Sequence, residues 1–226
     1  MPASLGATLE DRDWDQDIAA VHAGIESYYT EKVLTYGPTH AGVDWRSAAG
    51  QELRFAQLLT LCDFSRPFSL NDLGCGYAAL WGYLANHHAV NDIDYLGIDL
   101  SHQMIERAQR LWPPSPGRLN YVIGHASPRV GDYSVASGIF NVKLDQPLER
   151  WERFVARTLI GLRATSRLGF AVNFVAADTS LPPPPDGLYC ASAEPWIAFC
   201  QRRLGASVEL RDGYGLHEFT LVARLT

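Results

Sequence analysis

The sequence predicts an α/β protein whose central sheet is mostly parallel and covered by helices on both faces. Three observations support this prediction. An apolar run from Phe68 ends in Asp72 and leads directly into the turn Gly74-Cys75-Gly76, which a helix follows. Further apolar runs then alternate with helical segments, as in βαβ units. The last two strand-like runs, 207–211 and 217–224, are joined only by residues 212–216, which is too short a link for a parallel crossover. The last strand is therefore expected to be antiparallel.

Length and composition limit the classes of protein that fit. The chain has 226 residues, of which 47% are hydrophobic and 19% charged, with a net charge of −6. One domain with at most a small cap fits this length, and the acidic charge without any basic run disfavours a nucleic acid partner. No apolar run approaches the roughly 20 residues of a membrane span, and no signal peptide pattern opens the chain. We expect a cytoplasmic protein with reduced thiols and, since the four cysteines form no C-x-x-C pair, no metal site.

The elements are expected in the following order. Two helices, over 15–36 and 44–63, come before the first strand because apolar side chains recur there at helical spacing, and the glycines and proline of 37–42 separate them. Strands are expected at 68–72, 95–99, 119–124, 132–141, 168–175, 207–211 and 217–224, and helices at 79–88, from 101 to about 110, at 148–162 and at 193–204. We therefore divide the chain into a helical cap, residues 1–66, and a sheet domain, residues 67–226.

The glycine turn is the most informative segment. Glycines after a strand let the backbone approach a ligand closely, and the helix that follows offers free N–H groups. With Asp99 at the end of the second strand, the turn also fits a dinucleotide-binding fingerprint. Asp72, however, precedes the glycines, where it would repel a pyrophosphate and attract a cationic group. The chain also leaves little room for the second domain of a dehydrogenase.

A second motif narrows the choice of cofactor. The segment Tyr95-Leu96-Gly97-Ile98-Asp99-Leu100-Ser101-x-x-Met104-Ile105-x-x-Ala108 follows Asp72-Leu73-Gly74-Cys75-Gly76 at the right distance. Together they resemble the class I S-adenosylmethionine-dependent methyltransferases, over residues 68–224. The resemblance implies a three-layer sandwich around a seven-stranded sheet, with the last strand antiparallel. It also implies S-adenosylmethionine as the cofactor, S-adenosylhomocysteine as the product and no metal, with the N-terminal helices folded over cofactor and acceptor as a cap.

The resemblance also implies roles for single residues. Gly74 and Gly76 would line the methionine moiety with Asp72 near its ammonium group, Asp99 would accept hydrogen bonds from both ribose hydroxyls, and Leu100 would pack beside the adenine. The acidic residue that many relatives place near the adenine amino group is absent, so His125 is either its substitute or a plain loop histidine. Arg54 is either a clamp for the cofactor carboxylate or an arginine on the polar face of its helix. The full expected cofactor set is Arg54, Asp72, Gly74, Cys75, Gly76, Asp99, Leu100, Gly124, His125 and Ser137.

Candidates for acceptor binding come from the expected cap and from the end of the fourth strand, namely Tyr28, Tyr29, Lys32, Trp45 and Asn141. The aromatic rings could stack on a sulfonium or an acceptor by cation–π attraction, or pack the cap onto the sheet. Residues 136–141 do not match the Asn-Pro-Pro-Tyr pattern of amide and nucleobase methyltransferases, which weakens those substrate classes.

The chemistry of the acceptor decides which further groups are needed. A phenol or alcohol needs a base, for which His40, His125 and His217 are the histidines to consider. A carboxylate or an amine needs alignment and a cationic clamp such as Lys32 or Lys143. Our catalytic candidates are His40, His125 and Lys143.

We therefore expect an S-adenosylmethionine-dependent methyltransferase, monomeric or homodimeric, that methylates an O or N atom of a small-molecule metabolite. Two alternatives stay open. One is an NAD(P)-dependent oxidoreductase that uses the same glycine turn, and the other is a non-catalytic S-adenosylmethionine-binding partner subunit.

Overall fold

The computed structural model describes residues 11–177 and 186–225, with side chains described from Ile18 onward. The prolines at 182–185 lie outside these residues. The helices are α1 (Asp11–Tyr36), α2 (Ala48–Leu59), α3 (Ala79–His87), α4 (His102–Leu111), α5 (Leu148–Ala164) and α6 (Ala193–Leu204), with short 3-10 turns at Ala41–Val43 and Val90–Asp92. The strands are β1 (Phe68–Leu73), β2 (Ile93–Asp99), β3 (Leu119–Ile123), β4 (Gly131–Ala136), β5 (Ser166–Ala176), β6 (Cys190–Ala191), β7 (Ala206–Arg211) and β8 (Glu218–Leu225).

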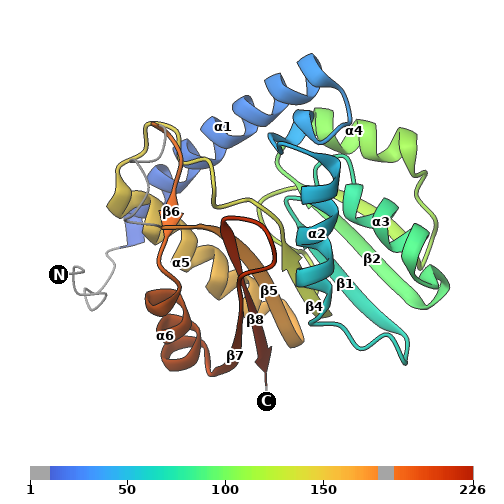
Figure 1. Ribbon diagram of the computed structural model, residues 1–226. Coiled ribbons are helices and arrows are strands. Elements are labelled where there is room, and N and C mark those ends of the chain that lie inside the picture. The colour runs from blue at the N-terminus through green and yellow to red at the C-terminus, as the bar shows by residue number, and fades with distance from the viewer. Residues whose placement is uncertain (1–10, 178–185, 226) are drawn as a thin grey trace.

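The strands form one sheet in the order β3-β2-β1-β4-β5-β8-β7 (Figure 1). The first five strands in chain order pair in parallel, and β8 lies antiparallel between β5 and β7. The predicted mixed sheet with its antiparallel last strand is confirmed. The short β6 was not predicted. It pairs with Val175 and Ala176 of β5, and because β8 already pairs with Val175 on one side, β6 lies on the other side, beyond the end of β4.

Two predicted boundaries are wrong for local physical reasons. The fourth strand ends at Ala136 and not at residue 141, because Gly138 has a φ of 75°, which extended backbone does not allow. The second helix begins at Ala48 and not at residue 44. Asp44 there has a φ of 60°, and the helix starts only after Ser47, whose hydroxyl accepts a hydrogen bond from the Gly50 N–H at 3.1 Å.

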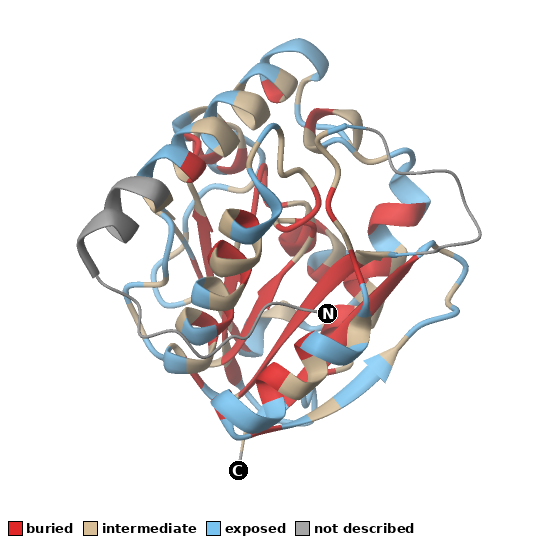
Figure 2. Ribbon diagram, turned by 90° about the vertical axis from the view of Figure 1, so that its left-hand side faces the viewer, coloured by how far each residue is buried: buried red, intermediate tan, exposed pale blue. Residues whose placement is uncertain are grey.

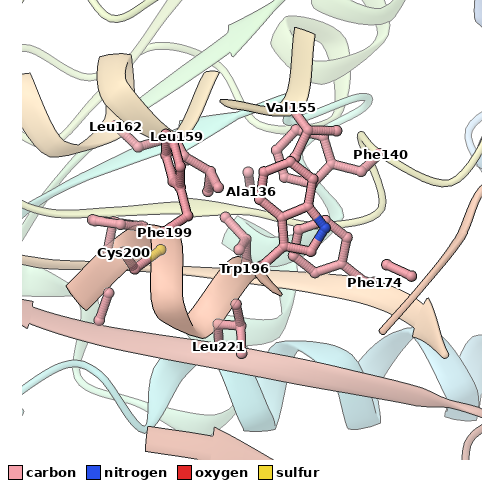
Figure 3. Close-up of a cluster of buried hydrophobic side chains, with 14 of the residues drawn as sticks. Ala136, Phe140, Val155, Leu159, Leu162, Phe174, Trp196, Phe199, Cys200 and Leu221 are labelled. Carbon is pink, nitrogen blue, oxygen red and sulfur yellow. The ribbon is translucent and has the colours of Figure 1, made fainter. Parts of the chain in front are cut away.

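Helices cover both faces of the sheet, as predicted. On one face α2, α3 and α4 pack onto a cluster of apolar residues that includes Leu58, Leu80 and Leu84. On the other face α5 and α6 pack onto β4, β5 and β8 through Leu159, Phe199 and neighbouring side chains (Figure 3). Seen from the side, the buried residues follow the strands while the outer helix surfaces are exposed (Figure 2). The sheet is therefore a rigid platform buried on both sides.

The two N-terminal helices take different places. α2 packs in the layer over β5 and β8, next to α3, whereas α1 lies across the carboxyl ends of the strands and contacts α4 and α5 (Figure 1). Two contacts fix α1 there. The hydroxyls of Thr30 and Ser101 are hydrogen-bonded at 2.6 Å, and the ring of His22 stacks on that of His125 at 4.7 Å between centroids. The division of the chain at residue 66 stays a prediction. Within the described residues no helix is both long enough and apolar enough to span a bilayer.

Trp151 is the largest fully buried side chain of the α5 layer, and its indole N–H donates to the Phe140 carbonyl at 3.0 Å. Replacing Trp151 by Ala leaves a cavity and an unsatisfied carbonyl, so we expect a loss of about 3 to 5 kcal/mol in the free energy of unfolding. Urea denaturation measures it. Leu148→Ala, at a position 55% exposed on the same helix, serves as the control and should change stability by less than about 0.5 kcal/mol. Equal losses in both variants would contradict this assignment of the core.

Candidate active site

A cavity of about 970 Å³, counting the solvent at its mouth, lies between α1, α2 and the carboxyl ends of the strands. Its walls come from the glycine turn after β1, the end of β2, and the loops after β3 and β4, together with one face of α1 and residues around the start of α2. Ligand sites in open α/β sheets lie at this edge, where neighbouring strands connect to opposite sides. The cavity is therefore the candidate active site.

The glycine turn is held against β2 by the chain itself. The N–H groups of Gly74 and Cys75 both donate to the Ile98 carbonyl, at 2.7 and 3.0 Å. Gly74 has a φ of 75°, and a Cβ at this position would lie 2.3 Å from Cγ2 of Ile139 in the loop after β4. Only glycine fits both the backbone conformation and the space. The turn thereby brings the loop after β4 to the floor of the cavity.

Asp99 links the glycine turn to the start of α4. Its Oδ2 accepts a hydrogen bond from the Gly76 N–H and its Oδ1 one from the Ser101 N–H, both at 2.8 Å. Burial raises the pKa of Asp99 to about 6, although these two N–H groups and that of Leu100 act in the opposite direction. Each carboxylate oxygen can still accept a further hydrogen bond, so the geometry is compatible with the predicted contact to a ribose diol.

Asp72 lies deeper in the same wall. It is 2% exposed and accepts a hydrogen bond from the Tyr95 hydroxyl. Burial raises the pKa of Asp72 to about 7, and the nearby charge of Asp99 adds to the increase, while the Tyr95 hydrogen bond opposes it. A cationic ligand beside this buried carboxyl group would lower its pKa and bind to the ionised form, because a nearby positive charge favours ionisation.

The structure brings most of the predicted site residues together. Those that line the cavity are Tyr29, Trp45, Asp72, Gly74, Cys75, Gly76, Asp99, Leu100, Gly124, His125 and Ser137. The cofactor candidates other than Arg54 are all among them. Their individual roles stay predictions.

The other candidates lie elsewhere, and three of them are held by hydrogen bonds. Tyr28 and Lys32 both bind the Asp44 carboxylate, at 2.7 and 2.6 Å. The Lys143 ammonium donates to two backbone carbonyls at 3.3 Å.

His40 and Asn141 also lie away from the cavity walls, and Arg54 is engaged with Glu218. His40 starts the 3-10 turn, where its carbonyl accepts the Trp45 N–H at 2.8 Å. Asn141 is 4% exposed within the loop after β4. Arg54 forms a buried ion pair with Glu218.

Sequence reasoning missed the cavity face of α1. His22, Ile25 and Glu26 line the cavity next to Tyr29, and the spacing of these four residues is that of one helix face. Burial, together with a smaller effect of the neighbouring His125, lowers the pKa of His22 to about 4. The helical spacing was visible in the sequence, but nothing in it showed which face of α1 would meet the sheet.

The ionisable groups that line the cavity are mostly acidic. Glu26, Asp72 and Asp99 contribute carboxyl groups to its walls, and among the described residues no lysine or arginine side chain lines it. A cationic ligand is therefore favoured and a pyrophosphate disfavoured.

The chain is 40% identical over 158 residues to a Mycobacterium tuberculosis (strain H37Rv) protein named "Putative methyltransferase Rv1506c", and the match covers 70% of this chain and 93% of that protein. This likeness agrees with the two sequence motifs, with the strand order of the sheet and with the acidic cavity. The chain belongs to the class I S-adenosylmethionine-dependent methyltransferases. No protein-family model matches this methyltransferase.

Solved structures resemble this methyltransferase in fold. Magnesium protoporphyrin IX methyltransferase from Synechocystis PCC 6803 with bound S-adenosylhomocysteine has a TM-score of 0.64 at 16% identity, covering 93% of this chain and all (100%) of that one. The DhpI–S-adenosylhomocysteine complex has a TM-score of 0.64 at 14% identity, over 91% and 97% of the two chains. Human N-acetylserotonin methyltransferase has a TM-score of 0.54 at 14% identity, over 91% and 67%. These likenesses bear on the fold alone.

The residues present fit the cofactor of this family. S-adenosylmethionine carries a sulfonium, an ammonium and a ribose diol, and the cavity offers the carboxyl groups of Asp72 and Asp99 with glycine backbone beside them. The hydroxyl of Ser137 adds a buried oxygen without a hydrogen-bond partner among the described residues. Such an atom gains a hydrogen bond when a ligand enters.

Replacing Asp99 by Ala should weaken the binding of S-adenosylhomocysteine by about 1 to 3 kcal/mol, because charged hydrogen bonds to the ribose are lost. Isothermal calorimetry measures the affinity. Asp92→Ala, which removes an exposed carboxylate just before β2, is the control and should leave the affinity unchanged. An unaltered affinity of the Asp99 variant would remove this residue from the cofactor site.

The affinity for S-adenosylhomocysteine should be about tenfold weaker at pH 6 than at pH 8, because Asp72, with a pKa of about 7, must lose its proton before it can face the ammonium group as an anion. Below a pH of about 6 the protonation of Asp99 adds to the loss. Calorimetry over this pH range tests the prediction. Asp72→Asn should remove most of the pH dependence between 6 and 8, and a profile that keeps its slope in this variant would contradict the role of Asp72.

Proposed function

We propose that this methyltransferase transfers the methyl group to an O or N atom of a small, uncharged metabolite. The observation that carries the proposal is the cavity itself. It lies under α1, its walls include the rings of Tyr29, Trp45 and Phe154, and no lysine or arginine of the described residues lines it. The net charge of −6 further disfavours a nucleic acid acceptor.

An anionic acceptor has little support. The two lysines that could have held a carboxylate, Lys32 and Lys143, are bound to Asp44 and to backbone carbonyls. A carboxylate acceptor would meet walls that carry the carboxyl groups of Asp72 and Asp99, and no lysine or arginine of the described residues lines the cavity to bind it. A neutral phenol, alcohol or amine avoids this cost.

The chain acts in this reaction chiefly by positioning. Bound S-adenosylmethionine supplies a methyl group on a sulfonium, and transfer by in-line displacement requires alignment and exclusion of water. In our proposal Asp72 and Asp99 orient the cofactor from the strand ends, while Trp45 and Tyr29 confine the acceptor. Together, α1 above and the glycine turn below keep the reacting atoms away from bulk solvent.

An O–H acceptor also has to lose a proton, and His125 is the base we propose. His125 lines the cavity, and His22 stacks on it. With a pKa lowered to about 4, His22 is uncharged at neutral pH, so it adds no positive charge beside His125. The other two histidines considered as a base, His40 and His217, do not line the cavity.

The proposal is tested by transfer of a labelled methyl group from S-adenosylmethionine to a cell extract, separated into small molecules, protein and nucleic acid. We expect label in the small-molecule fraction, extractable as a neutral or basic compound. The same extract incubated without the methyltransferase serves as the blank. Label only in protein or nucleic acid, or only in acidic small molecules, would overturn the proposed acceptor class.

Replacing His125 by Asn should lower kcat by about a hundredfold if this residue takes the acceptor proton, with the KM for S-adenosylmethionine nearly unchanged. The acceptor in this assay is the unlabelled small-molecule fraction of the extract that takes up the methyl label. His102→Asn, at an exposed site on α4, is the matched control. A raised KM for S-adenosylmethionine with unchanged kcat would instead make His125 a contact to the adenine.

A further inference from the structure

We propose that Arg54, Glu218 and Asn173 are positioning residues that hold Trp45 and residues 137–139 together as a fixed wall of the acceptor site. The inference rests on the proposed function, since it assigns this wall to the acceptor. It concerns residues from three separate elements, α2, β8 and β5. In this proposal Arg54, which the sequence suggested as a clamp for the cofactor carboxylate, instead binds Glu218.

The centre of the arrangement is a buried ion pair. Arg54 Nε donates to Glu218 Oε2 at 2.8 Å, and its Nη2 donates to Oε1 of the same carboxylate. The side chains of Arg54 and Glu218 are only 9% and 5% exposed. Two parallel N–H···O bonds fix the plane of the guanidinium, which a single contact would not do.

The indole ring of Trp45 stacks on this fixed guanidinium. The Cζ of Arg54 lies 3.7 Å from the centroid of the indole ring, in a cation–π arrangement. The benzene edge of Trp45 packs against Gly138, where a Cβ would lie 2.3 Å from the Cζ2 of the indole. Trp45 thus stands between Arg54 and the loop after β4, and it lines the cavity.

Asn173 links Glu218 to Gly138 through two hydrogen bonds. Its Nδ2 donates to Glu218 Oε2 at 2.9 Å, and its Oδ1 accepts the Gly138 N–H at 2.8 Å. Asn173 is 0% exposed. The contacts therefore run from Arg54 through Glu218 and Asn173 to Gly138, and from Gly138 through Trp45 back to Arg54.

The loop that contains residues 137–139 is also held at its far end. The Asn141 carbonyl accepts the Tyr189 N–H at 2.7 Å, and the Lys143 N–H donates to the Gly187 carbonyl at 2.8 Å. In this loop Ser137 lines the cavity, and its buried hydroxyl has no hydrogen-bond partner among the described residues. The same is true of the side-chain oxygen of Asn141, but that residue lies away from the cavity walls. The wall therefore combines a flat ring, Trp45, with one unsatisfied polar atom, which is suited to a planar acceptor with one hydrogen-bonding group.

A buried ion pair of this kind adds little net stability compared with an apolar pair of the same volume, although breaking it is costly. Its retention here is explained by geometry, because only directional bonds fix the ring of Trp45 relative to Gly138. An error of about 1 Å in such a wall is enough to lower a transfer rate about a hundredfold. Arg54, Glu218 and Asn173 would therefore act by holding this wall in position, without touching the reacting atoms.

The experiment uses the full-length protein labelled with 5-fluorotryptophan, with the fluorine signal of Trp45 assigned by Trp45→Phe. We expect Glu218→Gln and Asn173→Ala to shift or broaden this signal, while those of the core residues Trp151 and Trp196 stay in place. The KM for the small-molecule acceptor that takes up the label should rise about tenfold or more, with the affinity for S-adenosylhomocysteine changed by less than about threefold. Arg129→Lys is the matched control, since Arg129 is also multiply hydrogen-bonded but binds Asn71 and Asp94 at the opposite end of the strands.

Two results would overturn the proposal. One is an unchanged Trp45 signal and an unchanged acceptor KM in folded Glu218→Gln protein. The other is a uniform shift of all tryptophan signals together with a loss of cofactor affinity, which would indicate general destabilisation. If the single variants do not fold, Arg54→Met combined with Glu218→Leu removes both charges and gives the same readouts. The fluorine spectra need no acceptor, so a failure of the proposed methyl transfer is distinguished from a failure of this proposal.

Discussion

The cofactor site depends on the carboxylate of Asp99, which connects two of its backbone segments. One of its oxygens binds the N–H of Gly76 in the turn after β1, and the other binds the N–H of Ser101 at the start of α4. Two turns from adjacent strands are thereby held by one side chain. Ser101 is in turn hydrogen-bonded to Thr30 of α1. The position of the N-terminal helix over the cavity is consequently tied to the same carboxylate as the glycine turn.

The sequence was sufficient for those features that depend on local chain chemistry. The glycine turn was predictable because its positive φ angles require glycine, and the antiparallel last strand was predictable because residues 212–216 are too short for a crossover. Asp99 was identifiable since it ends a strand directly beside that turn. Each of these conclusions needs only the order of residues along the chain and the geometry of neighbouring strands.

Features that depend on distant partners were not predictable in the same way. Arg54 finds Glu218 only because α2 packs over β8, and no local pattern links two residues so far apart in sequence. His22 reaches the cavity only because α1 lies with one particular face towards the sheet. Lys32 and Lys143 were plausible clamps by charge, but Asp44 and two backbone carbonyls bind them first. The end of β4 was misplaced because the sequence does not show that Gly138 adopts a φ of 75°, at a place where the ring of Trp45 from another segment leaves no room for a side chain.

The burial of Asp72 also affects the stability of the protein. The unfolded chain loses the Asp72 proton near its ordinary pKa of 3.8, whereas the folded protein keeps it up to about 7. The folded state therefore binds more protons in this interval, and Asp72 lowers the free energy of unfolding as the pH rises through it. A cation held against the carboxylate removes that loss. The cofactor should accordingly protect the fold more at neutral pH than at mildly acidic pH, and its uptake near neutral pH should release protons to the buffer.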